Sequence, residues 1–541
     1  MTRTSTLTTL LLLPLIASTS HVARAANDDS AASLLPNGNF KTVTNDWPDE
    51  WPHGDGITWE KADQCLRLRS SKPGQMVMVY RRANLPSPPP EALEIRVRLR
   101  YSDVKSGEKQ WYDATFFAHF KDKAERTLSP DPAMPHYRGA SAGWVDFDAA
   151  VKVPKGAAML EIMPALFQPA SGTLDLASCQ VFPATEYLIP KVPIIPSEPI
   201  VPVKGSILPP EIHVSGNQLK TADEKIVWLQ GLCVDSLEWS AGGEHLKESI
   251  PVAIEQWKAN AIRLPVLDSF WFGRGDWQNP KEGGLPYRKI VDSVIEAAAS
   301  RGAYVILDLH RFGAPQPEQI EFWRDAATRY KNHPAVLFEL FNEPHDLSWK
   351  FWRDGGDLGN PQSKPVDAKD NAVQLTGEIS PGMQGLADVV RSTGAHNIMI
   401  AGGLDWGYDL SGVTQGFALI ERAGGNGIVY SSHIYPWKKD WQSHTLDAAV
   451  KYPLFVGEVG CPPDYSGFQF IPPDQRYPLD GWAADVLGMM QKNRLNWTGF
   501  SFHPTCGPPA ISDWNYTPTP FWGVFVKDAL SGKAFEMKRM R

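Results

Sequence analysis

The chain has 541 residues, a formal net charge of −8 at pH 7, and 20 tryptophans. This length exceeds that of one ordinary domain, and the mild acidity argues against a nucleic-acid partner, which usually requires a basic surface. The five cysteines fit no zinc-binding spacing, so the sequence does not indicate a cysteine-rich metal scaffold.

Residues 1–25 have the pattern of an export signal. Arg3 supplies a positive charge, residues 10–17 are apolar, and the Ala-Arg-Ala sequence at 23–25 fits a cleavage site before Ala26. The apolar run is shorter than the roughly 20 residues that a membrane-spanning helix needs, and no later segment is apolar enough. We therefore expect an exported protein, periplasmic or secreted, without a membrane span.

Residues 26–185 predict a β-sandwich. Short segments of alternating polarity, bounded by turn residues, indicate strands here, and helical periodicity is nearly absent. The clearest such segments are residues 93–102, 113–120 and 158–167.

Parts of this region are similar to jelly-roll carbohydrate-binding modules of the family 4 and family 9 type. The similar stretches are residues 34–40, 45–56 and 171–181. The resemblance implies a glycan-binding module, and a sandwich that only packs beside the next domain is the alternative. The side chains that could stack on sugar rings are Trp47, Trp51, Trp111, Tyr112 and Trp144.

Residues 186–210 form a proline-rich boundary between two domains. Prolines recur at every third position from Pro190 to Pro202, and polyproline II has three residues per turn, so the prolines would line one face of a stiff spacer. The interspersed Ile and Val residues leave a second interpretation open, in which the segment is a strap lying on the following domain.

Residues 211–541 alternate between strand and helix patterns. Apolar residues at helical spacing indicate helices at 290–300, 383–390 and 481–490, and residues 212–220 predict a hairpin at the bottom of the fold. This alternation over about 330 residues predicts a (β/α)8 TIM barrel. The expected barrel strands are residues 226–234, 261–266, 304–310, 336–343, 397–403, 428–435, 454–460 and 498–504.

Polar residues collect at the carboxyl ends of these strands, where barrel enzymes place their catalytic groups. Each of them could be a buried ion pair or a turn residue, but their joint placement favours one site. Two glutamates, Glu343 and Glu458, suit glycosidic cleavage, which needs one carboxylic acid and one carboxylate. The full set is Arg263, His310, Asn342, Glu343, His433, Tyr435 and Glu458.

The segments LFELFNEP (337–344) and LFVGEVG (454–460), supported by AIRLPV, LDLH and HIYPW, resemble glycoside hydrolase family 5, the cellulase family. The resemblance covers residues 205–541 and implies that Glu343 is the general acid/base and Glu458 the nucleophile. It further implies roles for the other residues of the set. Asn342 would bind the substrate 2-hydroxyl, Arg263 and Tyr435 would hold Glu458 ionised, and His310 and His433 would line the subsite of the reacting sugar.

One departure from the family pattern concerns strand eight, which usually ends with a tryptophan under the reacting sugar. Here Phe502 or His503 is expected at that place, and Trp514 from the next loop could substitute. The loops after the strands carry further tryptophans, at least two of which we expect to touch substrate. They are Trp239, Trp271, Trp406, Trp437, Trp441 and Trp514.

The sequence thus predicts a retaining β-glycoside hydrolase that acts on a β-linked polysaccharide of the β-glucan (cellulose) or mannan type. The alternative is a catalytically silent glycan-binding protein on the same scaffold. No metal and no cofactor are expected, and the protein is expected to be a monomer. A disulfide between Cys461 and Cys506 is predicted from their positions after neighbouring strands.

Overall fold

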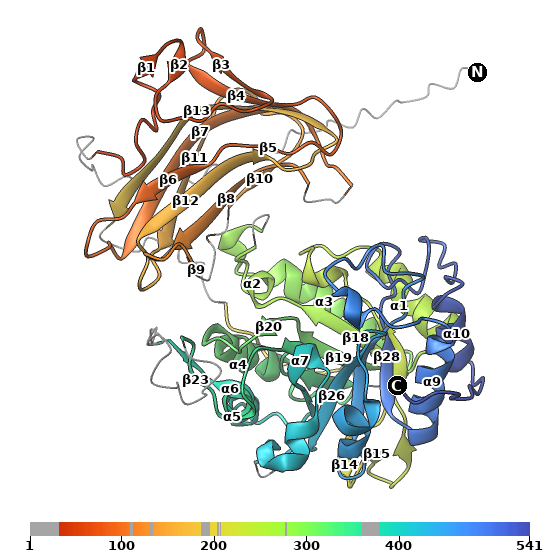
Figure 1. Ribbon diagram of the computed structural model, residues 1–541. Coiled ribbons are helices and arrows are strands. Elements are labelled where there is room, and N and C mark those ends of the chain that lie inside the picture. Colours follow the sequence, from red (N-terminus) through yellow and green to blue (C-terminus); the bar gives the residue numbers. More distant parts are fainter. Residues whose placement is uncertain are drawn as a thin grey trace, which may run out of the picture. The chain divides into compact units, whose positions relative to one another are not determined.

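The computed structural model describes residues 32–541 apart from 109–111, 129–131, 133, 185–194, 203–204, 206, 276–277, 360–377 and 423. The chain divides into two compact units, Met1–Ile189 and Pro190–Arg541 (Figure 1). The predicted signal peptide and Trp111 lie outside the described residues. Among the helices that are described, none combines the length and apolarity that crossing a membrane would require.

The amino-terminal unit consists of antiparallel sheets, as its alternating sequence predicts. Its strands are β1 (Val43–Thr44), β2 (Trp47–Pro48), β3 (Ile57–Glu60), β4 (Cys65–Ser70), β5 (Val77–Met78), β6 (Arg81–Asn84), β7 (Ala92–Lys105), β8 (Ala114–Lys121), β9 (Thr127–Leu128), β10 (His136–Tyr137), β11 (Val145–Lys152), β12 (Met159–Leu166) and β13 (Ser171–Ala184). One sheet has the order β11-β7-β13-β4-β3 and the other β10-β8-β12-β5, with β6 beside β12 and β9 beside β8.

Alternate residues of both sheets meet in one apolar core, which makes the unit a sandwich. Trp51, a predicted sugar platform, is only 3% exposed and belongs to this core. Trp47 packs against the core and stacks on His53 with ring centroids 3.9 Å apart. The guanidinium of Arg100 lies 4.5 Å from the ring of Trp144. Of the predicted platforms, Trp51 is therefore a structural residue.

The carboxy-terminal unit is a closed barrel of parallel strands, so the predicted TIM barrel is confirmed (Figure 1). Its strands, in their order around the barrel, are β17 (Gln230–Cys233), β18 (Ala261–Val266), β19 (Tyr304–Leu309), β21 (Val336–Glu339), β25 (Met399–Gly402), β26 (Ile428–Ile434), β27 (Leu454–Val459) and β28 (Asn496–Gly499).

Helices connect and surround these strands. They are α1 (Leu246–Pro251), α2 (Asp268–Trp271), α3 (Leu285–Ala299), α4 (Glu318–Tyr330), α5 (Trp349–Asp354), α6 (Gly382–Ser392), α7 (Leu404–Gly407), α8 (Asp447–Ala449), α9 (Trp482–Asn493) and α10 (Gly523–Leu530). The three helices predicted from apolar spacing correspond to α3, α6 and α9. Val291, Val294, Ile295 and Ala298 of the predicted apolar face of α3 are buried.

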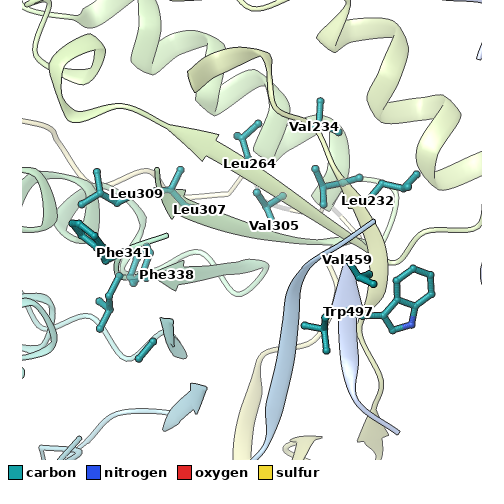
Figure 2. Packing of buried hydrophobic residues seen from close by; sticks show 14 of the residues in the cluster. Leu232, Val234, Leu264, Val305, Leu307, Leu309, Phe338, Phe341, Val459 and Trp497 are labelled. Carbon is teal, nitrogen blue, oxygen red and sulfur yellow. The ribbon is translucent and has the colours of Figure 1, made fainter. Parts of the chain in front are cut away.

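Two separate apolar cores hold the barrel together. The larger one lies between the strands and the helices and contains Leu264, Leu307 and Phe338 (Figure 2). The smaller one fills the lower interior with inward residues such as Ile306 and Phe455. Successive side chains of a strand point to opposite faces, so a strand such as β19 supplies both cores, with Leu307 in the larger and Ile306 in the smaller.

Short strands complete the unit. They are β14 (Ile212–Ser215), β15 (Gln218–Thr221), β16 (Ile226–Val227), β20 (Phe312–Gly313), β22 (Glu343–Pro344), β23 (Gly356–Asp357) and β24 (Ile379–Ser380). The predicted hairpin is formed by β14 and β15, which pair antiparallel. Ile212 and Leu219 of this hairpin belong to the lower interior core and close the bottom of the barrel.

The described part of the proline-rich segment lies on the barrel. Ser197 donates from its backbone nitrogen and its hydroxyl to the two carboxylate oxygens of Asp325 in α4, at 2.7 and 2.6 Å. Arg288 of α3 donates to the backbone oxygen of Ile195 at 2.8 Å. Residues 195–197 therefore correspond to the strap interpretation rather than to a free spacer.

The predicted disulfide is wrong, because all five cysteines are free. Cys461 and Cys506 lie beyond the ends of β27 and β28, at Val459 and Gly499. The close spacing of neighbouring strands applies only to residues that pair within the sheet. The thiol of Cys461 instead donates to the backbone oxygen of Pro462 at 3.6 Å.

Candidate active site

The upper interior of the barrel is lined by ionisable side chains. Arg263 of β18, Asp308 of β19, Glu339 of β21 and His433 of β26 all point inward and are fully buried. A buried charge is costly unless it is paired and hydrogen-bonded. These groups therefore have to satisfy one another, and the network they form positions the two glutamates.

Arg263 is the centre of this network. Its Nε donates to Glu339 at 2.6 Å, its Nη1 to Glu458 at 2.9 Å, and its Nη2 to the side-chain oxygen of Asn342 at 2.7 Å. Nη2 also lies 3.0 Å from Asp308. Burial alone would raise the pKa of Glu339, but the charges of Arg263 and His433 lower it to about 2. Glu339 thus pairs with interior polar groups of the barrel.

Glu458 is held as a carboxylate. Oε1 accepts from Arg263, and Oε2 accepts from the Tyr435 hydroxyl at 2.6 Å. Burial by itself would raise the pKa of Glu458, but the charges of His433 and Arg263 and the hydrogen bond from Tyr435 hold it below its ordinary value. The predicted partners of Glu458 are thus in contact with it, and they favour its ionised form.

A bulge in β27 aims Glu458 into the barrel. On one side, Ser431 and His433 of β26 pair with Phe455 and Glu458, so β27 has one residue more over the same length. The pairing of Val456 and Val459 with β28 shows the same extra residue on the other side. A bulge redirects a side chain in this way, and it allows Phe455 and Glu458 both to face the interior.

Glu343 lies beside Glu458, in the short strand β22 that follows β21. Its Oε1 is 2.9 Å from Nδ1 of His433, and the same nitrogen is 3.6 Å from Oε2 of Glu458. One oxygen of each glutamate and one nitrogen of His433 lie within 4.8 Å of one another. Burial lowers the pKa of His433, but the facing carboxylates raise it to about 9, so the ring is charged at neutral pH.

Asn342 and His310 occupy the positions beside this pair. Nδ2 of Asn342 is buried without a hydrogen-bond partner among the described residues, while its oxygen is fixed by Arg263. His310 contacts Asp308 through Nδ1 at 2.7 Å and Glu238 through Nε2 at 2.5 Å. His310 is thus tied between two carboxylates, and Glu238 is a site residue that the sequence did not indicate.

Strand eight differs from its prediction. β28 begins and ends earlier than expected, at Asn496–Gly499, so Phe500 follows it directly. Phe500 clusters with Tyr435 and Cys233 beside Glu458, and its ring lies 6.3 Å from that of Tyr435. Phe502 is buried against Trp257 instead. Phe500 is therefore an aromatic residue beside Tyr435 at the end of strand eight, which the sequence reasoning missed.

The predicted tryptophans divide into core and surface residues. Trp271 and Trp441 are fully buried, so their prediction as loop platforms is wrong. Trp406 is 46% exposed and stacks on His345 with ring centroids 3.5 Å apart. Trp437 lies parallel to Tyr435, with ring centroids 4.8 Å apart. Trp437 thus packs on the ring whose hydroxyl donates to Glu458.

Trp406 is linked to Glu343 through a neighbouring aromatic residue. Phe312 of β20 pairs with Glu343 of β22, is half exposed, and has its ring 6.2 Å from that of Trp406. Asp405 and Trp406 both have left-handed backbone conformations, with φ of 54° and 62°. Such strain in non-glycine residues is concentrated at functional sites.

His503 and Trp514 belong to a second group of side chains. Their rings are 4.7 Å apart, Nε2 of His503 contacts Glu244 at 3.2 Å, and Trp239 donates to the same glutamate at 2.8 Å. This group lies on the loops after β17 and β28. Its hydrogen bonds run to Glu244, and the role of His503 and Trp514 in binding substrate stays a prediction.

Comparisons with known proteins identify the family of this chain. The family model described as Cellulase (glycosyl hydrolase family 5) matches residues 221–505. An endoglucanase of a Microbulbifer species is 27% identical over 145 residues, which are 26% of this chain and 27% of that protein. An endoglucanase of Paenibacillus polymyxa is 26% identical over 355 residues, 56% of this chain and 83% of that protein.

Among solved structures, a β-glucanase of Saccharophagus degradans is 25% identical, with a TM-score of 0.48 over 64% of this chain and 98% of that one. Of the two curated relatives, the chain spans little more than a quarter of the Microbulbifer protein and most of the Paenibacillus protein. The family model covers more than half of the chain, including Glu343 and Glu458. The chain belongs to glycosyl hydrolase family 5, the cellulase family.

Proposed function

We propose that this protein hydrolyses the glycosidic bonds of a β-linked glucan with retention of anomeric configuration. The observation that carries the proposal is the pair Glu343 and Glu458, whose nearest oxygens lie within 4.8 Å. Carboxyl groups about 5–5.5 Å apart are typical of retaining glycosidases, whereas inverting enzymes keep them about 6.5–9.5 Å apart to admit a water molecule. The close pair favours direct attack by one carboxylate.

In the first step, Glu458 attacks the anomeric carbon. A bond forms between its carboxylate oxygen and that carbon, the bond to the leaving oxygen breaks, and Glu343 gives its proton to the leaving oxygen. Arg263, Tyr435 and His433 keep Glu458 ionised before the attack. Oε1 of Glu343 is occupied by His433, which leaves Oε2 to carry the proton.

In the second step, water releases the sugar. Attack consumes the negative charge of Glu458, so Glu343 can remain a carboxylate and take a proton from a water molecule. The oxygen of that water bonds to the anomeric carbon while the bond to Glu458 breaks. Two inversions at one carbon give net retention.

Neighbouring groups support a sugar at this place. The free amide nitrogen of Asn342 can donate to the hydroxyl next to the anomeric carbon, because Arg263 already holds its oxygen. Phe500 and Trp437 flank Tyr435, and Trp406 lies on the side of Glu343. Flat aromatic rings suit the apolar faces of sugar rings. A β-glucan is the favoured substrate class because the relatives are named endoglucanases.

A substrate panel tests the proposal. The protein, its Glu458→Ala variant and its Glu458→Gln variant would be incubated with soluble β-1,4-, β-1,3- and mixed-linkage glucans and with β-mannan, and reducing ends would be counted. We expect release from at least one glucan by the unmodified protein and none by the variants. Binding to glucans without release on any member of the panel would instead support a silent glycan-binding protein.

We also propose that the protein is exported, because residues 1–25 have the charge, apolar run and small residues of a signal peptide. Sequencing the amino terminus of protein recovered from the periplasm or medium of its host should find Ala26 first. Recovery of the uncleaved chain from the cytoplasm alone would contradict the proposal.

A further inference from the structure

Three buried polar atoms converge below the two glutamates. They are Oγ of Ser431, Nε2 of His433 and Oε1 of Glu339, and none has a hydrogen-bond partner among the described residues. They come from two strands, β26 and β21, and all three face Gly457 of β27. A Cβ atom at residue 457 would lie 2.6 Å from Ser431, 2.9 Å from His433 and 3.1 Å from Glu339.

Gly457 provides room at this point rather than an unusual backbone conformation. Its φ lies outside the left-handed region that glycine alone adopts readily. An alanine would nevertheless place its methyl group too close to the hydroxyl of Ser431. The missing side chain thus lets the three polar atoms approach the backbone closely, so groups that need hydrogen bonds converge on Gly457.

The three polar atoms do not satisfy one another. Nε2 of His433 and Oε1 of Glu339 are 3.9 Å apart, which exceeds a hydrogen bond but suits two groups bridged by one water molecule. The other nitrogen of His433, Nδ1, is engaged with Glu343, and the other oxygen of Glu339 accepts from Arg263. Each group therefore has its remaining polar atom directed at Gly457.

We propose that one ordered water molecule is bound against Gly457 by Ser431, His433 and Glu339. Its oxygen accepts from Nε2–H of His433, and its two hydrogens are donated to Oε1 of Glu339 and Oγ of Ser431. Three polar partners are the usual number for a buried water, and such waters are held by groups that would otherwise be unsatisfied. Each of the three converging atoms then has a hydrogen-bond partner.

The bound water gives His433 a second anchor. Nδ1 of the ring lies 2.9 Å from Glu343 and 3.6 Å from Glu458, so a small rotation of the ring would alter its contacts with both. Gly407 closes one side of the ring, since a Cβ there would lie 3.0 Å from Nδ1. Ser431, Glu339 and Gly457 are therefore positioning residues that act through His433. This role rests on the proposed function, whereas the water site itself does not.

A crystal structure that shows ordered water tests the site directly. We expect density for one water within hydrogen-bond distance of all three side chains. Empty density there, a direct bond between His433 and Glu339, or the shorter contacts of a metal cation would each overturn the assignment. This result does not depend on whether the protein hydrolyses any glycan, so a failure of the proposed function would be distinguishable.

The anchoring role is tested with Ser431→Ala and a matched control, Ser432→Ala. Ser432 is the next residue of β26 and equally buried, but its hydroxyl donates to the backbone of Tyr408 at 2.8 Å on the opposite face. The readout is the titration of His433 by NMR of histidine-labelled protein, with its signal assigned from a His433→Asn variant.

We expect Ser431→Ala to lower the midpoint of the His433 titration by about 0.5–1 pH unit, because the water loses a partner and binds the charged ring less well. Ser432→Ala should leave the midpoint unchanged. The titratable groups facing the ring are Glu339, Glu343 and Glu458, and none is altered in either variant. An unchanged midpoint in Ser431→Ala, or an equal shift in both variants, would overturn the role.

Discussion

Glu343 and Glu458 have different surroundings although their oxygens are close. Glu458 accepts from Arg263 and Tyr435, which stabilise its charge, while the nearest partner of Glu343 is His433. Neighbouring carboxyl groups in unequal environments take separate acid and nucleophile roles. The assignment of each glutamate therefore follows from its partners rather than from its distance to the substrate.

Substitution of each glutamate should separate the two roles. Glu458→Ala should lose nearly all activity on every substrate, because no other group can form the bond to the anomeric carbon. Glu343→Ala should lose about 10²–10⁴-fold on polysaccharide but much less on an aryl β-glycoside whose leaving group needs no proton. The measurement is kcat/KM on both substrates. Equal losses on both by Glu343→Ala would contradict its role as the acid.

Because of His433, the free energy of unfolding should fall at alkaline pH. Its pKa in the folded state is about 9, above the ordinary value near 6.5. The charged ring therefore contributes stability fully below about pH 6.5, and this contribution, up to about 3 kcal/mol, is lost as pH rises through 9. Denaturant unfolding from pH 6 to 10 should show this loss in the unmodified protein but not in His433→Asn. Parallel curves for the two proteins would refute it.

At the scale of residues, most side chains of the buried network could be predicted from the carboxyl ends of the strands. Arg263, Asn342, Tyr435 and the two glutamates could be predicted because the carboxyl ends of barrel strands are where catalytic side chains gather. Gly457 could not, since its importance lies in the polar side chains that approach its backbone. Nothing in a sequence pattern shows which buried atoms lack partners.

At the scale of elements, strand existence was easier to predict than strand ends. β18 matches its predicted range, Ala261–Val266, because a run of apolar residues flanks a single charge. β28 was misplaced because Phe500 and Phe502 continue an apolar pattern beyond Gly499, where pairing ends. The bulge in β27 was also missed, because a one-residue shift between neighbouring strands leaves no mark on the polarity pattern.

The strap before the barrel should stabilise it measurably. Ser197 donates two hydrogen bonds to Asp325, and Arg288 donates to Ile195 and Ser197. The backbone nitrogen of Ile200 donates to α4 at 2.7 Å. The free energy of unfolding of a barrel variant beginning at residue 195 should exceed that of one beginning at residue 207 by about 3–5 kcal/mol. This estimate assigns about 1 kcal/mol to each of these hydrogen bonds. Denaturant titration measures the difference. Equal stabilities would show that the strap contributes nothing.

At the scale of the whole molecule, the two units have independent cores. The barrel sequence alternates strand and helix, and the amino-terminal sequence alternates polarity at strand spacing, so both architectures could be predicted. The sugar-binding surface of the sandwich could not be predicted equally well. Trp51 is a core residue, and a tryptophan in a strand does not reveal which way its ring faces.

Removal of the sandwich tests whether it serves substrate binding. A variant lacking residues 26–185 should bind insoluble β-glucan more weakly while its turnover of a small soluble glycoside is unchanged, because the proposed catalytic residues all belong to the barrel. The measurements are a pull-down with insoluble glucan and initial rates on the soluble glycoside. The isolated sandwich should be retarded by glucan in affinity electrophoresis, and no retardation would mark it as structural.

The stereochemistry of hydrolysis tests the central claim, that Glu458 attacks the anomeric carbon itself. Proton NMR of the first-formed product, recorded before mutarotation, reports its anomeric configuration. The close oxygens of Glu343 and Glu458 and the stabilised charge on Glu458 predict a β-anomer from a β-linked glucan. An α-anomer as the first product would require a water molecule between the two glutamates and would contradict the assignment of Glu458 as the nucleophile.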